Sequence, residues 1–117
     1  GKDNSIGLKL DFQLDNGKSK AVSKLDSRYE GYEGIVHGGI ITLILDEAAA
    51  KAVISTGKVG VTARINVSFL KVFNTEKEFE VSAEVKEMKR RKVTVLSELR
   101  SEGELKAKSE SIFFLLK

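Results

Sequence analysis

The residues best suited to chemistry lie in one short stretch, in which His37, Gly38 and Gly39 are followed by Asp46. The first turn of a helix leaves backbone N–H groups unpaired, and the helix dipole makes that end positive. Two consecutive glycines remove the side chains that would keep a ligand away from those donors. If a helix begins here, the N–H of Gly38, with Gly39 beside it, can stabilise the oxyanion formed when a carbonyl is attacked. The alternative is a tight entry into the helix that needs glycine only for packing.

Asp46 is the candidate acid because aspartate is a poor residue for the middle of a helix. The residues three and four positions away include no cation; they are Thr42, Leu43, Ala49 and Ala50. A carboxyl group without a local counter-charge is suited to proton transfer or nucleophilic attack. The alternative is an exposed aspartate with no chemical role.

Glu47 is the rival acid, since it is adjacent to Asp46 in the chain. However, Lys51 follows it by four residues, which is the favourable order for an ion pair on a helix. We therefore expect Glu47 to be a salt-bridged surface residue and favour Asp46.

These residues require a helix, and the segment from about Gly38 to Ser55 predicts one. Its apolar side chains cover nearly the whole circumference, so we expect the helix to be buried in the domain. Gly57 is a suitable C-terminal stop.

The rest of the chain predicts strands. Before the helix, alternation over 8–14 leads through the turn at 15–18 to a returning strand at 21–25 and a glycine-punctuated loop at 29–34. After the helix, strands are expected at about 59–69, 79–85, 93–99 and 105–116. One apolar helix must be covered by a sheet. We therefore expect an α+β fold in which a curved, mostly antiparallel sheet of five or six strands wraps around one central helix, forming a single domain over residues 1–117.

Residues 31–48, with His37, Gly38, Gly39 and an acid nine positions after the histidine, resemble the phenylacetate-type (His-Gly-Gly motif) branch of the hotdog-fold acyl-CoA thioesterases. Residues 61–70 resemble the next strand of that group, and the resemblance extends from about residue 28 to the C-terminus. It implies hydrolysis of an acyl-CoA to a carboxylic acid and free CoA, without a cofactor, with Asp46 as nucleophile or general base.

The resemblance also suggests roles for neighbouring residues. It implies that His37 orients and caps the glycine loop, although a catalytic base or a plain loop histidine are alternatives. It implies that Thr62 helps to place the attacking water. Strand alternation puts Thr62 opposite the core-facing Val61 and Ala63, towards a subunit interface or solvent. Relatives often carry Asn or Gln where this chain has Gly31, so the placement of the water is left unexplained.

The distance between the two candidate groups predicts an oligomer. Asp46 lies eight residues beyond Gly38, or about 12 Å along a straight helix at 1.5 Å per residue. Both cannot touch one carbonyl, so Asp46 of one subunit must meet Gly38 of another. A homodimer is therefore expected, and a homotetramer stays open.

Composition excludes several other classes of function. The chain has no cysteine and one histidine, which rules out thiolate chemistry and a histidine-rich metal site, so no metal is expected. The net charge of +3 is mild and both signs are interspersed, unlike a nucleic-acid binder. No apolar signal segment is present, which makes the cytoplasm the default location. Charged residues interrupt the apolar stretch 40–54, so no membrane span is expected.

One basic cluster, Lys89, Arg90 and Arg91 with Lys92, could bind the phosphates of CoA. It could equally be a solvated bend between strands. Two other functions stay open for the whole chain. One is a non-catalytic module that binds acyl-CoA, and the other, less favoured, is a hotdog hydratase or dehydratase.

Overall fold

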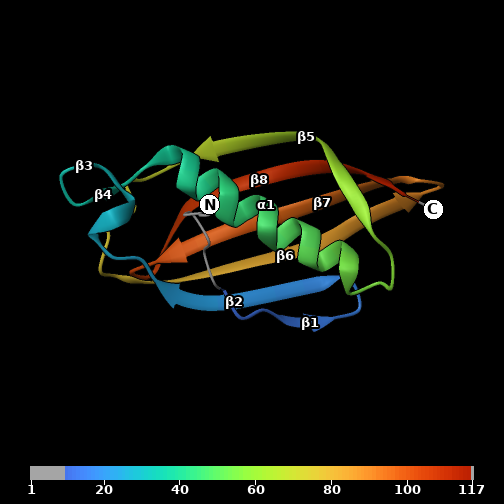
Figure 1. The fold of residues 1–117 in the computed structure, drawn as a ribbon, viewed down its shortest axis with the longest axis horizontal. Coiled ribbons are helices and arrows are strands. Elements are labelled where there is room, and N and C mark those ends of the chain that lie inside the picture. The colour runs from blue at the N-terminus through green and yellow to red at the C-terminus, as the bar shows by residue number, and fades with distance from the viewer. Residues whose placement is uncertain (1–9, 117) are drawn as a thin grey trace.

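The computed structural model describes residues 10–116, which form one helix packed on one face of a six-stranded sheet (Figure 1). The helix is α1 (Gly38–Ile54). The sheet strands are β1 (Gln13–Asp15), β2 (Lys18–Lys24), β5 (Gly60–Phe69), β6 (Glu78–Lys89), β7 (Lys92–Ser101) and β8 (Glu104–Leu115). They lie in the order β1-β2-β6-β7-β8-β5, and each neighbouring pair is antiparallel. This confirms the predicted α+β architecture, with six strands in the main sheet.

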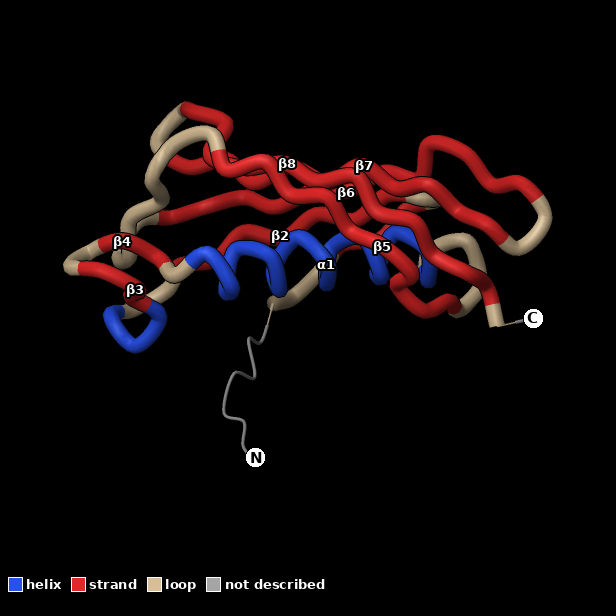
Figure 2. Tube along the Cα trace, turned by 90° about the horizontal axis from the view of Figure 1, so that it is seen from above, coloured by secondary structure: helices blue, strands red, loops and turns tan. Residues whose placement is uncertain are grey.

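The face of the helix that packs on the sheet includes three small residues among its seven buried ones. Ala48, Ala49 and Ala52 are fully buried there. The Ser19 side chain on β2 donates a 2.6 Å hydrogen bond to the Ala48 carbonyl, which ties the helix to the strand below it. Figure 2, seen from above, shows the helix lying along one face of the sheet. Among the described residues no helix is long and apolar enough to cross a membrane.

The expectation that α1 is buried on all sides is wrong for one face. Leu43 and Ile54 keep 44% and 43% of their surface exposed, and Glu47 between them is exposed as well. These residues point away from the sheet, which supplies only one layer of cover. The sequence could not distinguish a helix enclosed by its own chain from one with an apolar face left open.

The β1–β2 hairpin forms at the predicted turn. Asn16 and Gly17 have φ values of 40° and 86°, the left-handed region that an Asn-Gly pair adopts in two-residue hairpins. The N-terminal part of the predicted first strand, including Leu8, lies outside the described residues.

The predicted loop before the helix contains structure that its sequence did not indicate. A short 3-10 turn, Ser27–Tyr29, leads into a small hairpin of β3 (Glu30–Tyr32) and β4 (Ile35–Val36). The backbone N–H of Val36 donates to the Phe73 carbonyl, and that of His37 donates to the Tyr29 carbonyl. These bonds fix the chain just before α1.

A β-bulge in β5 reverses the expected orientation of Thr62. The register with β8 pairs Thr62 with Phe113 but then pairs Arg64 with Ile112, so Ala63 is the extra residue. Phe113 is buried against the helix, and its partner Thr62 therefore faces the helix too. The prediction that Val61 and Ala63 face the core is wrong, since both are exposed. Such a bulge leaves the residue types of the strand unchanged, and simple alternation cannot reveal it.

Candidate functional site

The N-terminus of α1 presents one unpaired backbone amide. His37 is the N-cap, and its Nδ1 accepts a 2.8 Å hydrogen bond from the N–H of Gly39. The next two amides, those of Ile40 and Ile41, donate to the His37 carbonyl. Within the described residues the N–H of Gly38 has no such partner. The two glycines therefore differ, because Gly39 is used in the cap while Gly38 keeps a free donor.

The glycines around His37 are required by close packing. A Cβ atom on Gly39 would lie 3.0 Å from the His37 Nδ1, and one on Gly31 would lie 2.9 Å from the His37 Cα. The second distance is shorter than real Cβ contacts, so a side chain at Gly31 would displace the backbone of the N-cap. Gly31 therefore lies against His37 and presents no polar group. A Cβ on Gly38 would meet only the Phe69 ring, at 3.7 Å.

Phe69 was predicted only as part of a strand, yet it is the side chain closest to the Gly38 position. It is the last residue of β5, and 56% of its surface is exposed. The alternation of the strand gave no indication that its end lies beside the start of α1. Among the described residues, this apolar ring is the side chain that a Cβ atom on Gly38 would contact.

The Asp46 carboxylate is held by one hydroxyl group. The Thr62 Oγ1 donates a 2.8 Å hydrogen bond to the Asp46 Oδ1, joining the middle of α1 to the start of β5. Asp46 is half-buried, and the Thr62 side chain is exposed. The bond follows from the bulge at Ala63, which turns Thr62 towards the helix. It fixes the orientation of the carboxylate and leaves its second oxygen for another partner.

Glu47 lies beside Asp46 but makes a different contact. Its carboxylate is 3.9 Å from the Lys51 Nζ, four residues along the helix. This confirms the predicted ion pair. Glu47 points to the exposed side of α1, whereas Asp46 points to β5.

The structure does not bring Gly38 and Asp46 together within one chain. Both belong to the same continuous helix, so their separation of eight residues corresponds to about 12 Å. The free Gly38 amide and the oriented Asp46 carboxylate are therefore held by separate sets of contacts.

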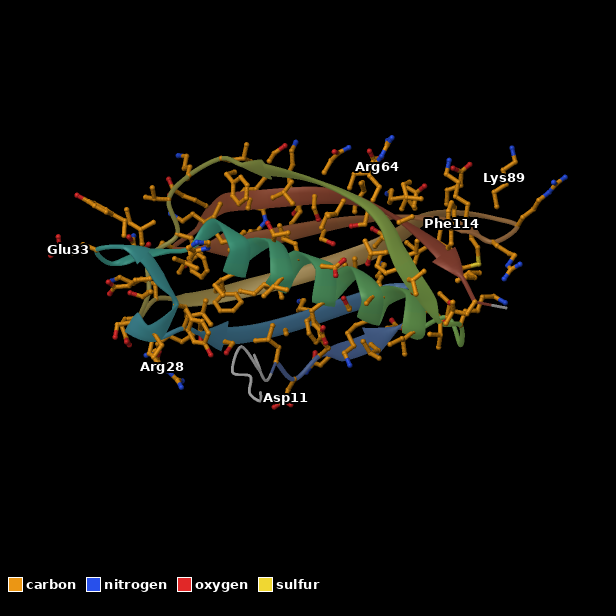
Figure 3. All side chains as sticks on the ribbon, turned by 45° about the horizontal axis from the view of Figure 1, so that its top comes forward. Asp11, Arg28, Glu33, Arg64, Lys89 and Phe114 are labelled. Atoms are coloured by element: carbon orange, nitrogen blue, oxygen red, sulfur yellow. The ribbon has the colours of Figure 1, made fainter. Side chains whose placement is uncertain are left out.

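The basic cluster forms the tip of the β6–β7 hairpin. Figure 3 shows Lys89 at the end of the molecule opposite Glu33, which lies in the β3–β4 hairpin near the start of α1. Arg90 has a φ of 59° in the tight turn. Arg91 is used differently, since its Nε and Nη2 donate to the carbonyls of Leu115 and Leu116 at 3.2 and 3.1 Å. Its guanidinium holds the end of β8, while Lys89 and Arg90 extend into solvent.

Other charged groups lie outside this site. The Arg28 side chain lowers the pKa of Asp26 through hydrogen bonds at the 3-10 turn. The Lys71 ammonium lowers the pKa of Glu104 at the start of β8. Over residues 10–116, no group of three or more His, Cys, Asp or Glu side chains is placed to hold a metal ion.

Comparison with known sequences gives one family. The sequence model of the thioesterase superfamily matches residues 33–108, which include α1 and most of the sheet. A search of curated proteins gives no match.

Solved structures share the fold. A hypothetical thioesterase protein from Streptococcus pneumoniae with coenzyme A is 20% identical, with a TM-score of 0.89 over 94% of this chain and 90% of that chain. A Streptococcus mutans protein bound to acetyl CoA is also 20% identical, with a TM-score of 0.89 over 93% and 90%. A mutant of the phenylacetic acid degradation protein PaaI from Thermus thermophilus is 24% identical, with a TM-score of 0.86 over 93% and 95%. The first protein also has two variant structures, in which an aspartate, or a threonine sixteen positions later, is replaced by alanine.

The cap at His37 predicts a difference between two substitutions. His37→Ala removes the acceptor for the Gly39 N–H and should lower the free energy of unfolding by about 1 kcal/mol. His37→Asn keeps a side-chain oxygen that can cap the helix and should retain most of that stability. Thermal unfolding of both variants beside the wild type measures this. Equal destabilisation by Ala and Asn would contradict the capping role.

Proposed function

Because this chain belongs to the thioesterase superfamily, we propose that it hydrolyses an acyl-CoA thioester to a carboxylic acid and free CoA. The observation that carries the proposal is that one helix presents both a free Gly38 amide and an Asp46 carboxylate oriented by Thr62. Coenzyme A and acetyl CoA in two structures of the same fold support this substrate class. CoA is part of the substrate, so the proposal involves no separate cofactor.

The proposed chemistry divides between the two groups. The Gly38 N–H donates to the thioester carbonyl oxygen and stabilises the negative charge that develops there. Asp46 takes a proton from a water molecule as its oxygen attacks the carbonyl carbon, or the carboxylate attacks that carbon itself. The C–S bond then breaks, and the CoA thiolate takes up a proton. Where the carboxylate is the nucleophile, water then hydrolyses the acyl–Asp46 anhydride, which releases the carboxylic acid and restores Asp46. His37 keeps Gly39 in the cap and thereby positions Gly38 without touching the substrate.

We further propose that each site is shared between two copies of the chain. Since about 12 Å of helix separates Gly38 from Asp46 in one copy, a partner must supply one of them. The β5 strand supports this, because it ends the sheet with ten residues, Gly60–Phe69, of which only Arg64 is charged. A long edge strand with so little charge is suited to pairing with another strand. The exposed Leu43 and Ile54 of α1 provide apolar surface for the same contact.

The spacing of the acid and the hydroxyl supports the roles of Asp46 and Thr62. Sixteen positions separate them in this chain. The same number separates the aspartate and threonine that are replaced in the variants of the Streptococcus pneumoniae protein. In our proposal Thr62 holds the carboxylate and helps to place the attacking water.

Lys89 and Arg90 are proposed to contact the CoA phosphates. They lie at the tip of the β6–β7 hairpin, and Lys89 is at the end of the molecule opposite Glu33 (Figure 3). If the β5 strands of two copies pair antiparallel, the hairpin tip of one copy lies towards the start of α1 in the other copy. Arg91 supports the hairpin through the end of β8 and is not assigned a phosphate.

A second candidate function is a non-catalytic module that binds acyl-CoA. The observation in its favour is Gly31, where packing against His37 excludes any side chain that could hold water. Such a module would bind acyl-CoA and release no thiol.

The role of Asp46 predicts the effect of a single substitution. Asp46→Asn keeps the shape of the side chain but removes the base, so kcat should fall by about 10²–10⁴-fold. The measurement is thiol release from a panel of acyl-CoA substrates. Glu47→Gln, next to it on the exposed face, is the matched control and should retain activity. Equal rates for wild type and Asp46→Asn would refute the assignment.

The shared site predicts complementation between two inactive variants. Gly38→Val blocks the free amide and Asp46→Asn removes the base, so each protein alone should be nearly inactive. After the two are unfolded and refolded together, half of the dimers are mixed and each has one intact site. Mixing equal amounts should therefore restore about a quarter of wild-type activity. No recovery in correctly folded mixed dimers would place both groups in the same chain.

The basic hairpin predicts a change in substrate affinity. The double substitution Lys89→Ala with Arg90→Ala should raise KM for acyl-CoA roughly three- to tenfold, because contacts with phosphate are lost. KM for the matching acyl-pantetheine, which lacks the nucleotide, should not change. Arg91→Ala should instead lower the melting temperature. An unchanged KM for acyl-CoA in the double variant would exclude the hairpin from binding.

A further inference from the structure

Within residues 10–116, three buried serine side chains have no protein hydrogen-bond partner. They are Ser97 on β7 and Ser109 and Ser111 on β8, with 1%, 5% and 0% of their surface exposed. A buried hydroxyl without a partner destabilises a folded chain, and native proteins pair nearly all such groups with protein or ordered water. Three adjacent exceptions therefore require an explanation.

The three hydroxyls continue the polar line that begins at Thr62. Ser97 and Ser109 are directly paired across β7 and β8, and Ser111 follows Ser109 on the same face. Ser111 in turn pairs with Ile65 on β5 and lies two residues along β8 from Phe113, the partner of Thr62. Diagonal neighbours of this kind are roughly 7–8 Å apart across a sheet. The line thus runs from the Asp46–Thr62 pair along the side of the sheet that faces α1.

Other buried serines in the same sheet have protein partners. Ser19, in the same cross-strand row as Ser97, donates to the Ala48 carbonyl at 2.6 Å. Ser101 on β7 donates to the Glu78 carbonyl at 2.7 Å. A buried serine in this sheet can therefore reach a backbone acceptor where its surroundings provide one. The unpaired three lie together, on the side of the sheet towards β5 and the carboxylate.

We propose that Ser111, Ser109 and Ser97 bind a short row of internal water molecules that positions the hydrolytic water beside Asp46. A buried water typically makes about three hydrogen bonds to groups that otherwise lack partners, and a cluster of hydroxyls meets that requirement. Gly31 presents no polar side chain for this purpose. The inference rests on the proposed thioester hydrolysis and adds the residues that hold its second substrate.

The step balances with water as the only co-reactant. The water oxygen forms a bond to the thioester carbonyl carbon as one of its protons passes to the Asp46 carboxylate. The tetrahedral intermediate then expels the sulfur with the C–S bonding electrons. The proton on Asp46 passes to the thiolate, which gives free CoA and the carboxylic acid. The serines move no proton in this step and act as positioning residues.

The test compares Ser111→Ala and Ser109→Ala with Ser19→Ala. Loss of one hydroxyl from this row should lower kcat by up to about tenfold, with KM and the affinity for CoA unchanged. Ser111→Thr, which keeps a hydroxyl, should restore most of the rate. Ser19→Ala, the matched control, should lower the melting temperature through its lost partner and leave kcat unchanged.

Two results would overturn the inference without touching the proposed function. One is an active wild type whose kcat is unchanged in both Ser111→Ala and Ser109→Ala. The other is a rise in melting temperature in both variants, the behaviour of dry, unpaired hydroxyls, which can be measured even without activity. Absence of thiol release by the wild type would instead refute the hydrolysis and the role of the water together.

Discussion

The close packing of α1 on the sheet is the constraint on which the rest of the structure depends. Small residues on both sides, Ala48 and Ala49 on the helix and Ser19 and Ala83 on the strands, let the two layers approach closely. The Ser19 bond to the Ala48 carbonyl adds one tie between the two layers. The packed orientation of the helix directs Asp46 to β5 and Glu47 to solvent. A larger residue in this contact would move the carboxylate, because packed layers transmit changes in volume.

At the N-terminus of the same helix, two neighbouring glycines use their backbone amides differently. The Gly39 N–H donates to the side chain of the N-cap, His37, whereas the Gly38 N–H has no such partner within residues 10–116. The His37 side chain therefore determines which amide remains available to a ligand. Gly31 of the β3–β4 hairpin lies against the backbone of His37, because it has no Cβ atom to separate the two segments. These contacts, all between groups of the protein, position the free Gly38 amide.

Much of the fold could be predicted from the sequence because its periodic patterns are strong. The helix was expected at 38–55 and occurs at Gly38–Ile54, and the last strand was expected at 105–116 and occurs at Glu104–Leu115. The candidate site was only partly accessible. The ion pair of Glu47 followed from spacing, but the side of β5 that carries Thr62 depends on a bulge, whose extra residue is an unremarkable alanine. The open face of α1 was missed because apolar residues look alike whether their own chain or another surface covers them.

The uncovered edge of β5 has a consequence for how the protein behaves in a cell. If two copies complete each other's sites, a newly made chain is inert until it meets a second one. Catalytic output then rises faster than in proportion to the amount of chain at low abundance, since assembly follows mass action. Expression level would set a threshold for turnover, and a single unprotected strand would be the physical origin of that threshold.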